Sequence, residues 1–248
     1  MFDPRDDLCV EYITLLNLLG RHEEAYRCTQ IRKFHPWEGG EGKITTQYTL
    51  ALAELARGAL RSGKAAQAKE LLQKALVFPG NLGEGKLEGE KDNNIYYYLG
   101  CACEALGDSA GAEENWRRAS VGDQEPAGMM YYNDQPADMI FYQGLALRKL
   151  GLEEKALSRF HKLVDYGEKH IFDQVSIDYF AVSLPDLQLF DEDLNVRNQA
   201  HCQYLIALGS YGLGNRVRAK KACEETLKID CAHIGAVLHR KLLVQIEI

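Results

Sequence analysis

Five glycines, each followed five residues later by an alanine, divide this 248-residue chain at regular intervals. Each glycine follows an apolar helical pattern, and glycine readily adopts the left-handed conformation that ends a helix. Because the alanine stands at the same distance every time, the segments around each glycine are expected to form a repeated unit. The pairs are Gly20 and Ala25, Gly63 and Ala68, Gly107 and Ala112, Gly151 and Ala156, and Gly214 and Ala219.

Residue size also recurs at fixed distances from these glycines. Seven positions before the turn, four of the units have a small residue: Ala56, Gly100, Gly144 and Ala207. The first unit has the larger Ile13 there. Small side chains allow two helix axes to approach closely. The pattern therefore predicts a pair of packed helices around each glycine.

These positions resemble the tetratricopeptide repeat, a helix–turn–helix unit of 34 residues with small residues where its two helices cross. The resemblance implies an all-α fold, a right-handed superhelix of about five tetratricopeptide-like (TPR-like) helix-turn-helix repeats with long inter-repeat loops and a C-terminal capping helix. We expect a single solenoid over residues 1–248. Its repeats are predicted at 6–39, 49–82, 93–126, 137–170 and 200–233, and its cap at 234–248.

The turn glycines are farther apart than one repeat requires. Their separations are 43, 44, 44 and 63 residues, so each of the first four repeats is followed by an insertion. The phase places these insertions at about 40–48, 83–92, 127–136 and 171–199, always before the next repeat's first helix. In a stacked array such loops gather along one edge, and loops of this kind often carry a binding function.

The inserted loops share an unusual composition. Gly-Glu-Gly-Lys occurs at 40–43 and again at 83–86, and the third loop contains Tyr-Tyr-Asn-Asp at 131–134. Glycine N–H groups, carboxylates and flat aromatic rings suit a peptide with basic and apolar groups, or a carbohydrate. The candidate binding residues are Trp37, Glu38, Glu41, Lys43, Glu84, Lys86, Tyr131, Tyr132, Asn133 and Asp134. Three roles remain open for the loops: ligand contact, packing against another domain, and structural support.

The fourth insertion is too long for a bare connection. Its stretch IFDQVSIDYFAVSLPDLQLF, residues 171–190, is rich in aromatic and β-branched residues. This composition predicts a strand-like or short helical element, and Pro185 limits the length of any helix there.

Charge and cysteine content exclude several functional classes. The net charge of −7 argues against non-specific binding to nucleic acid or to anionic membranes, which requires clustered Lys and Arg. Seven Cys residues without a CxxC pair are typical of small buried hydrophobes in a reducing compartment. The acidic start MFDPRDDL lacks the pattern of a signal peptide. A cytoplasmic location is therefore expected.

No catalytic residue, metal site or cofactor is predicted. His35, Glu38 and Glu41 share one loop, without a second ligand set at metal-binding spacing. The Gly-Glu-Gly-Lys turns lack the spacing, and the following Ser or Thr, of a phosphate-binding loop.

The loop sequences carry a closer resemblance. The segments HPWEGGEGK, NLGEGK, YYNDQPADMIFYQGLALRKLG and IDYFAVSLPD are similar to the C-terminal TPR region of large bacterial multidomain proteins. Those proteins have an uncharacterised, carbohydrate-associated N-terminal β-sandwich region. The resemblance implies a non-enzymatic protein-interaction or scaffolding module that binds a protein segment or a sister domain of its parent protein. The alternative is a helical accessory region of a carbohydrate-active enzyme, whose acidic and aromatic loops contribute to a sugar-binding site.

Overall fold

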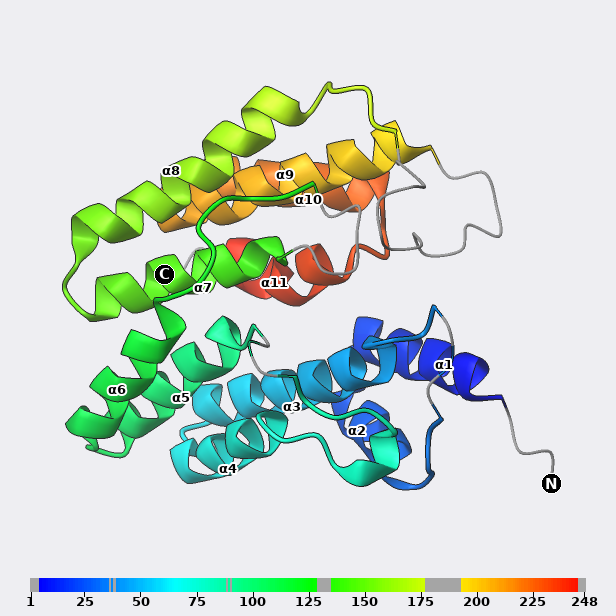
Figure 1. Ribbon diagram of the computed structural model, residues 1–248. Helices are drawn as coiled ribbons and strands as arrows, with labels where there is room; N and C mark the ends of the chain where they lie inside the picture. Colours follow the sequence, from blue (N-terminus) through cyan, green and yellow to red (C-terminus); the bar gives the residue numbers. More distant parts are fainter. Residues whose placement is uncertain are drawn as a thin grey trace. The chain divides into compact units, whose positions relative to one another are not determined.

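The computed structural model describes residues 5–35, 37, 39–87, 89, 91–128, 135–176 and 193–244. Within these residues the chain folds into helices joined by turns and loops (Figure 1). None of the described helices is long and apolar enough to cross a membrane. Two compact units divide the chain, Met1–Arg118 and Ala119–Ile248, and each is described by itself.

The described part of the first unit consists of three helical hairpins. They are α1 (Asp6–Leu18) with α2 (His22–Gln30), α3 (Lys43–Arg61) with α4 (Ala65–Ala75), and α5 (Asn93–Ala105) with α6 (Ser109–Ala119). A short 3-10 turn, η1 (Gly80–Leu82), lies between α4 and α5. The hairpins stack in sequence order, because α2 packs on α3 and α4 packs on α5.

The second unit contains two further hairpins and a final helix in its described residues. They are α7 (Ala137–Lys149) with α8 (Glu153–His170), α9 (Leu194–Gly212) with α10 (Arg216–Ile229), and α11 (Ile234–Val244). Within the described residues α9 packs against α7, α8, α10 and α11, which explains why α9 is buried along most of its length. The final helix α11 packs on α10 and α9, as the predicted capping helix should.

A glycine in the left-handed region ends the first helix of every hairpin. The φ angles of the five turn glycines lie between 71° and 81°, where any other residue is strained. The residue after each glycine donates its backbone N–H to the first helix, as Asp108 does to the Cys103 carbonyl at 2.9 Å. This shared geometry confirms the TPR-like helical repeats that the glycine and alanine spacing predicts.

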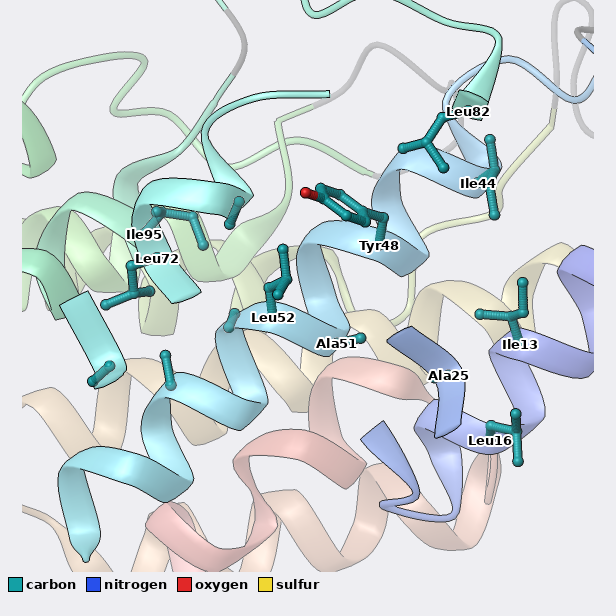
Figure 2. Close-up of a cluster of buried hydrophobic side chains, with 14 of the residues drawn as sticks. Ile13, Leu16, Ala25, Ile44, Tyr48, Ala51, Leu52, Leu72, Leu82 and Ile95 are labelled. Atoms are coloured by element: carbon teal, nitrogen blue, oxygen red, sulfur yellow. The ribbon is translucent and has the colours of Figure 1, made fainter. Parts of the chain in front are cut away.

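The core of the first unit includes part of an insertion. Figure 2 shows Leu82 of η1 in the same buried cluster as Ile44 and Tyr48 of α3. The Tyr48 hydroxyl donates to the Lys74 carbonyl at 3.1 Å, and burial raises the pKa of Tyr48 to about 12. The second inserted loop is therefore anchored by its own apolar residue rather than suspended above the helices.

The longest insertion is described only at its ends. Residues 177–192, on which most of the predicted strand-like or short helical element falls, lie outside the described residues. On the near side α8 extends to His170, and on the far side α9 begins at Leu194.

Candidate functional site

The first two inserted loops lie against each other in the first unit. Phe34 donates its backbone N–H to the Asn81 carbonyl at 2.7 Å. The Asn81 side-chain amide donates to the carbonyls of Thr29 and Arg32 at 2.8 and 2.9 Å. Asn81 therefore satisfies carbonyls at and just after the end of α2, which have no partner within the helix. We call the described residues of 31–42 and 79–92, which these contacts connect, the loop edge.

The two Gly-Glu-Gly-Lys turns are joined directly. Gly42 donates its backbone N–H to Oε2 of Glu84 at 2.7 Å. Gly42 has a φ of 74° and stands immediately before α3, so the Glu84 carboxylate lies at the positive end of that helix. A charged acceptor on a backbone N–H makes one of the stronger protein hydrogen bonds. The repeated motif thus acts as a clamp in which the second copy holds the first.

Lys86 of the second inserted loop pairs with Asp92, which stands immediately before α5. Its ammonium lies 2.7 Å from Oδ1 of Asp92 and 4.9 Å from the centre of the Phe78 ring. Both charged side chains are largely buried, at 18% and 11% exposed. Burial raises the pKa of Asp92, and the Lys86 charge opposes that shift. Lys86 is therefore engaged within the fold.

Trp37 packs into the first loop. Its side chain is half-buried against the core of the first unit, and the Trp37 carbonyl accepts the Gly40 N–H at 2.9 Å. A Cβ at Gly40 would overlap the indole ring, so glycine is required there. Beside this wedge, Glu41 is exposed and Lys43 is half-buried at the start of α3.

Other candidate loop residues lie outside the described residues. They are Glu38, Tyr131, Tyr132, Asn133 and Asp134, whose binding role stays a prediction. His35, considered above with Glu38 and Glu41 as a possible metal ligand, instead contacts Asp6. Oδ2 of Asp6 accepts the His35 backbone N–H at 2.9 Å. A search of the described ranges finds no group of three or more His, Cys, Asp or Glu able to hold a metal ion.

The described start of the third loop is held against the second unit by backbone carbonyls. Gln135 and Gln143 both donate a side-chain N–H to the Asp123 carbonyl, at 2.7 and 2.8 Å. Nε2 of His201, on α9, lies 2.8 Å from the Ala127 carbonyl. Residues 123–127 are thus fixed to α7 and α9.

A second candidate surface lies on the first helices of neighbouring hairpins in the first unit. Arg57 of α3 forms an ion pair with Glu54, and its guanidinium carbon lies 5.6 Å from the centre of the Tyr98 ring on α5. The Tyr97 and Tyr98 rings meet edge to face, with centroids 5.2 Å apart. We call Leu50, Glu54, Arg57, Tyr97 and Tyr98 the first-helix row.

The first-helix row combines a sheltered charge pair with half-buried apolar surface. The Arg57 and Glu54 side chains are only 7% and 12% exposed, so their charges interact in a medium less polar than water. Tyr97, Tyr98 and Leu50, which precedes Glu54 by one helical turn, are half-buried. Aromatic rings next to a sheltered arginine are frequent at the centres of protein interfaces.

Repeat spacing was the signal that could have located this row. Glu54 and Arg57 stand nine and six residues before Gly63, and Tyr98 stands nine residues before Gly107. Glu54 and Tyr98 thus occupy equivalent positions on successive first helices, and Arg57 lies one turn after Glu54.

Comparison with known proteins gives a distant structural likeness. No family model matches the chain. Among solved structures, the chain is similar to that of YrrB, a TPR protein with an unusual peptide-binding site. The sequences are 16% identical, the match covers 94% of this chain and 90% of that chain, and the TM-score is 0.32. A likeness of this degree assigns neither function nor residues.

Proposed function

We propose that this chain is a non-catalytic protein-interaction or scaffolding module of the TPR type, that it belongs to a larger bacterial protein, and that it works in the cytoplasm. Its partner is a protein segment or a sister domain of the parent protein. The single observation that carries the proposal is the first-helix row, in which two consecutive hairpins place Arg57 and the tyrosines of α5 side by side.

The chemistry of the row indicates the kind of segment that fits. Tyr97 and Tyr98 contribute half-buried aromatic rings, which suit apolar and aromatic side chains. The Arg57 guanidinium lies over the Tyr98 ring and is balanced by Glu54, so the row has no net charge. An extended or helical segment with one or two aromatic or aliphatic anchors suits this surface better than a highly charged ligand.

The loop edge has a supporting role in this proposal. Glu84 and Lys86 make contacts within the first unit, and Trp37 packs over Gly40. Their polar and aromatic groups are thus committed to loop structure. The proposed loop contacts with the partner are Glu38, Glu41, Lys43 and the residues of 131–134.

The carbohydrate-active alternative draws on the same loop residues. A sugar site needs carboxylates and aromatic rings presented to hydroxyl groups. Glu84 bonds to Gly42 and Trp37 packs over Gly40, which favours a structural role for Glu84 and Trp37. A carboxylate and an aromatic ring are then committed within the fold rather than presented to a sugar, which favours the protein-binding module. A thermal shift with oligosaccharides would instead favour the sugar site.

Peptide selection on the immobilised full chain tests the proposal. Phage-displayed random peptides are enriched, and the affinity of the best peptide is measured by fluorescence anisotropy for wild type and Tyr97→Ala. Tyr97 is chosen because Tyr98 also packs against the core of the first unit. Glu113→Ala is the matched control, since Glu113 is exposed on α6, where it pairs with the exposed Arg117.

We expect Tyr97→Ala to weaken binding about tenfold or more, as for an aromatic residue at an interface centre. Glu113→Ala should leave the affinity unchanged. Circular dichroism checks that both variants keep the helix content of wild type. Equal affinities for Tyr97→Ala and wild type, or failure to enrich any peptide, would overturn the proposal.

A further inference from the structure

The outer face of α1 carries a stripe of exposed apolar side chains. Leu8, Tyr12, Leu15 and Leu19 follow one another at intervals of four, three and four residues, and each is more than half exposed. The opposite face of α1 is buried in the first unit through Val10, Ile13 and Leu16. Isolated exposed apolar residues are ordinary, whereas a contiguous stripe indicates an interaction surface.

The repeat architecture shows what this face does in other hairpins. Leu8, Tyr12 and Leu15 stand twelve, eight and five residues before the turn glycine. The equivalent residues are buried in one later first helix of each unit: Ile95, Leu99 and Ala102 on α5, and Cys202, Ile206 and Gly209 on α9. In these hairpins the preceding second helix covers the face, with α4 packing on α5 and α8 on α9. In these two hairpins a helix covers this face, whereas on α3 the equivalent Leu55 and Gly58 are only half-buried.

A helix that covers the outer face of α1 must pack differently from the helices that cover α5 and α9, because the side chains of α1 are larger. On α9 the position of Leu15 is Gly209, where an added Cβ would overlap the backbone carbonyl of Phe160 on α8. Leucine at that position of α1 excludes such a close backbone approach. Spacings of four and three with large apolar residues instead match the heptad seam of two helices packed side chain to side chain.

The seam is complementary to itself in the antiparallel direction. When two copies of α1 run antiparallel, Leu8 lies opposite Leu19 of the partner subunit, and Tyr12 lies opposite Leu15 of the partner subunit. Every layer then joins one a position to one d position, as in antiparallel coiled coils. A surface that matches itself under a two-fold rotation is the condition for an isologous dimer.

We infer that a second copy of this chain covers α1, and that the two α1 helices pack antiparallel in a two-fold dimer. The occupant is another copy because the stripe supplies both sides of every layer of the seam. Each chain carries a net charge of −7, so salt should strengthen the dimer by screening the repulsion between the copies.

Light scattering coupled to size exclusion tests the dimer with the full chain. Wild type should approach twice the chain mass of 27.9 kDa as its concentration rises. Leu15→Lys should raise the dissociation constant about tenfold or more, because dimerisation would desolvate the ammonium. Val217→Lys is the matched control, because Val217 is 80% exposed on α10 and should not affect association.

Cross-linking tests the geometry. With p-benzoylphenylalanine in place of Tyr12, irradiation should join position 12 to α1 of the partner subunit near Leu15. Attachment to position 12 of the partner subunit indicates a parallel pair, and attachment elsewhere in the same chain indicates another occupant. Either result overturns the inference. So does a wild type that stays monomeric up to roughly 100 µM, or a Leu15→Lys variant that dimerises equally well.

Discussion

The indole ring of Trp116 occupies the space into which a side chain at Gly100 would project, so α5 and α6 cross in close contact there. The same relationship recurs 44 residues later, where Phe160 of α8 fills the space beside Gly144 of α7. A small residue before the turn and a large one after it are thus the two sides of one contact.

Alanine substitution at two helical glycines of the first unit should have opposite effects. Gly100→Ala forces a methyl group into Trp116 and should lower the free energy of unfolding by about 1–3 kcal/mol, as overpacking does. Gly58→Ala, with no atom within 4 Å of the added Cβ, should raise it by about 0.5–1 kcal/mol through helix propensity.

Tryptophan fluorescence during urea unfolding measures both variants. The chain has two tryptophans, Trp37 and Trp116, and both lie in the first unit, so the signal reports that unit. Effects of the same sign for the two variants would contradict the close crossing at Gly100.

The clamp between the two inserted loops should contribute measurably to stability. Glu84→Ala removes the acceptor of the Gly42 N–H and should cost about 1–2 kcal/mol, since bonds to charged groups exceed the average. Glu84→Gln keeps an acceptor and should cost less. Glu41→Ala, at an exposed position of the equivalent motif, should change stability by less than about 0.5 kcal/mol. If Glu84→Ala behaves like Glu41→Ala, the clamp is absent and Glu84 is again a candidate ligand residue.

A buried polar network fastens the capping helix in the second unit. The Tyr142 hydroxyl lies 2.8 Å from Nε2 of His239 on α11, and the Tyr204 hydroxyl lies 2.9 Å from Nδ1. Tyr142→Phe should cost about 1–3 kcal/mol, because it leaves a buried imidazole nitrogen without that partner. Chemical unfolding followed by circular dichroism measures the cost. In the double variant with His239→Leu the cost should be less than the sum of the two single variants, and strict additivity would argue against coupling.

Acid should weaken the attachment of α11. Burial lowers the pKa of His233 below its ordinary 6.5, with Asp230 opposing the shift, and Nδ1 of His233 accepts the Ala236 N–H at 3.2 Å. Because the folded state favours the neutral imidazole, its contribution to stability is present above pH 6.5 and is lost as the pH falls through the lowered pKa.

Thermal unfolding at a series of pH values tests this effect against His233→Asn. Asparagine is a good helix cap and does not titrate, so the variant should lose less stability than wild type between about pH 7.5 and 5. Because the two proteins differ only at position 233, the comparison isolates the effect of this side chain. Parallel pH profiles would show that His233 does not carry the dependence.

Local geometry explains why the sequence predicts the hairpins so well. A left-handed turn needs glycine, and a close helix crossing needs a small residue. The residue type at Gly107 and at Gly100 therefore indicates the structural role of each position. The same repeat spacing predicts a further helix near Ile234, and α11 begins at that residue.

The candidate site is less predictable because its contacts are distant in sequence. Gly42 and Glu84 are 42 residues apart, and only the stacking of two hairpins brings them together. From its sequence position Arg57 is expected to be an ordinary solvated charge on α3. In the structure its guanidinium group packs against the Tyr98 ring of α5. Sequence spacing therefore predicts that the loops share one edge, but it does not predict which residues the loop side chains contact.

Photo-cross-linking with a selected peptide tests the central claim most directly. The peptide carries a benzophenone beside its aromatic or aliphatic anchor, and the attachment sites on the full chain are mapped by mass spectrometry. The first-helix row predicts attachment within residues 50–57 of α3 and 94–101 of α5. Attachment confined to the loop residues 37–43 and 84–86, or to the second helices α2 and α4, would contradict it.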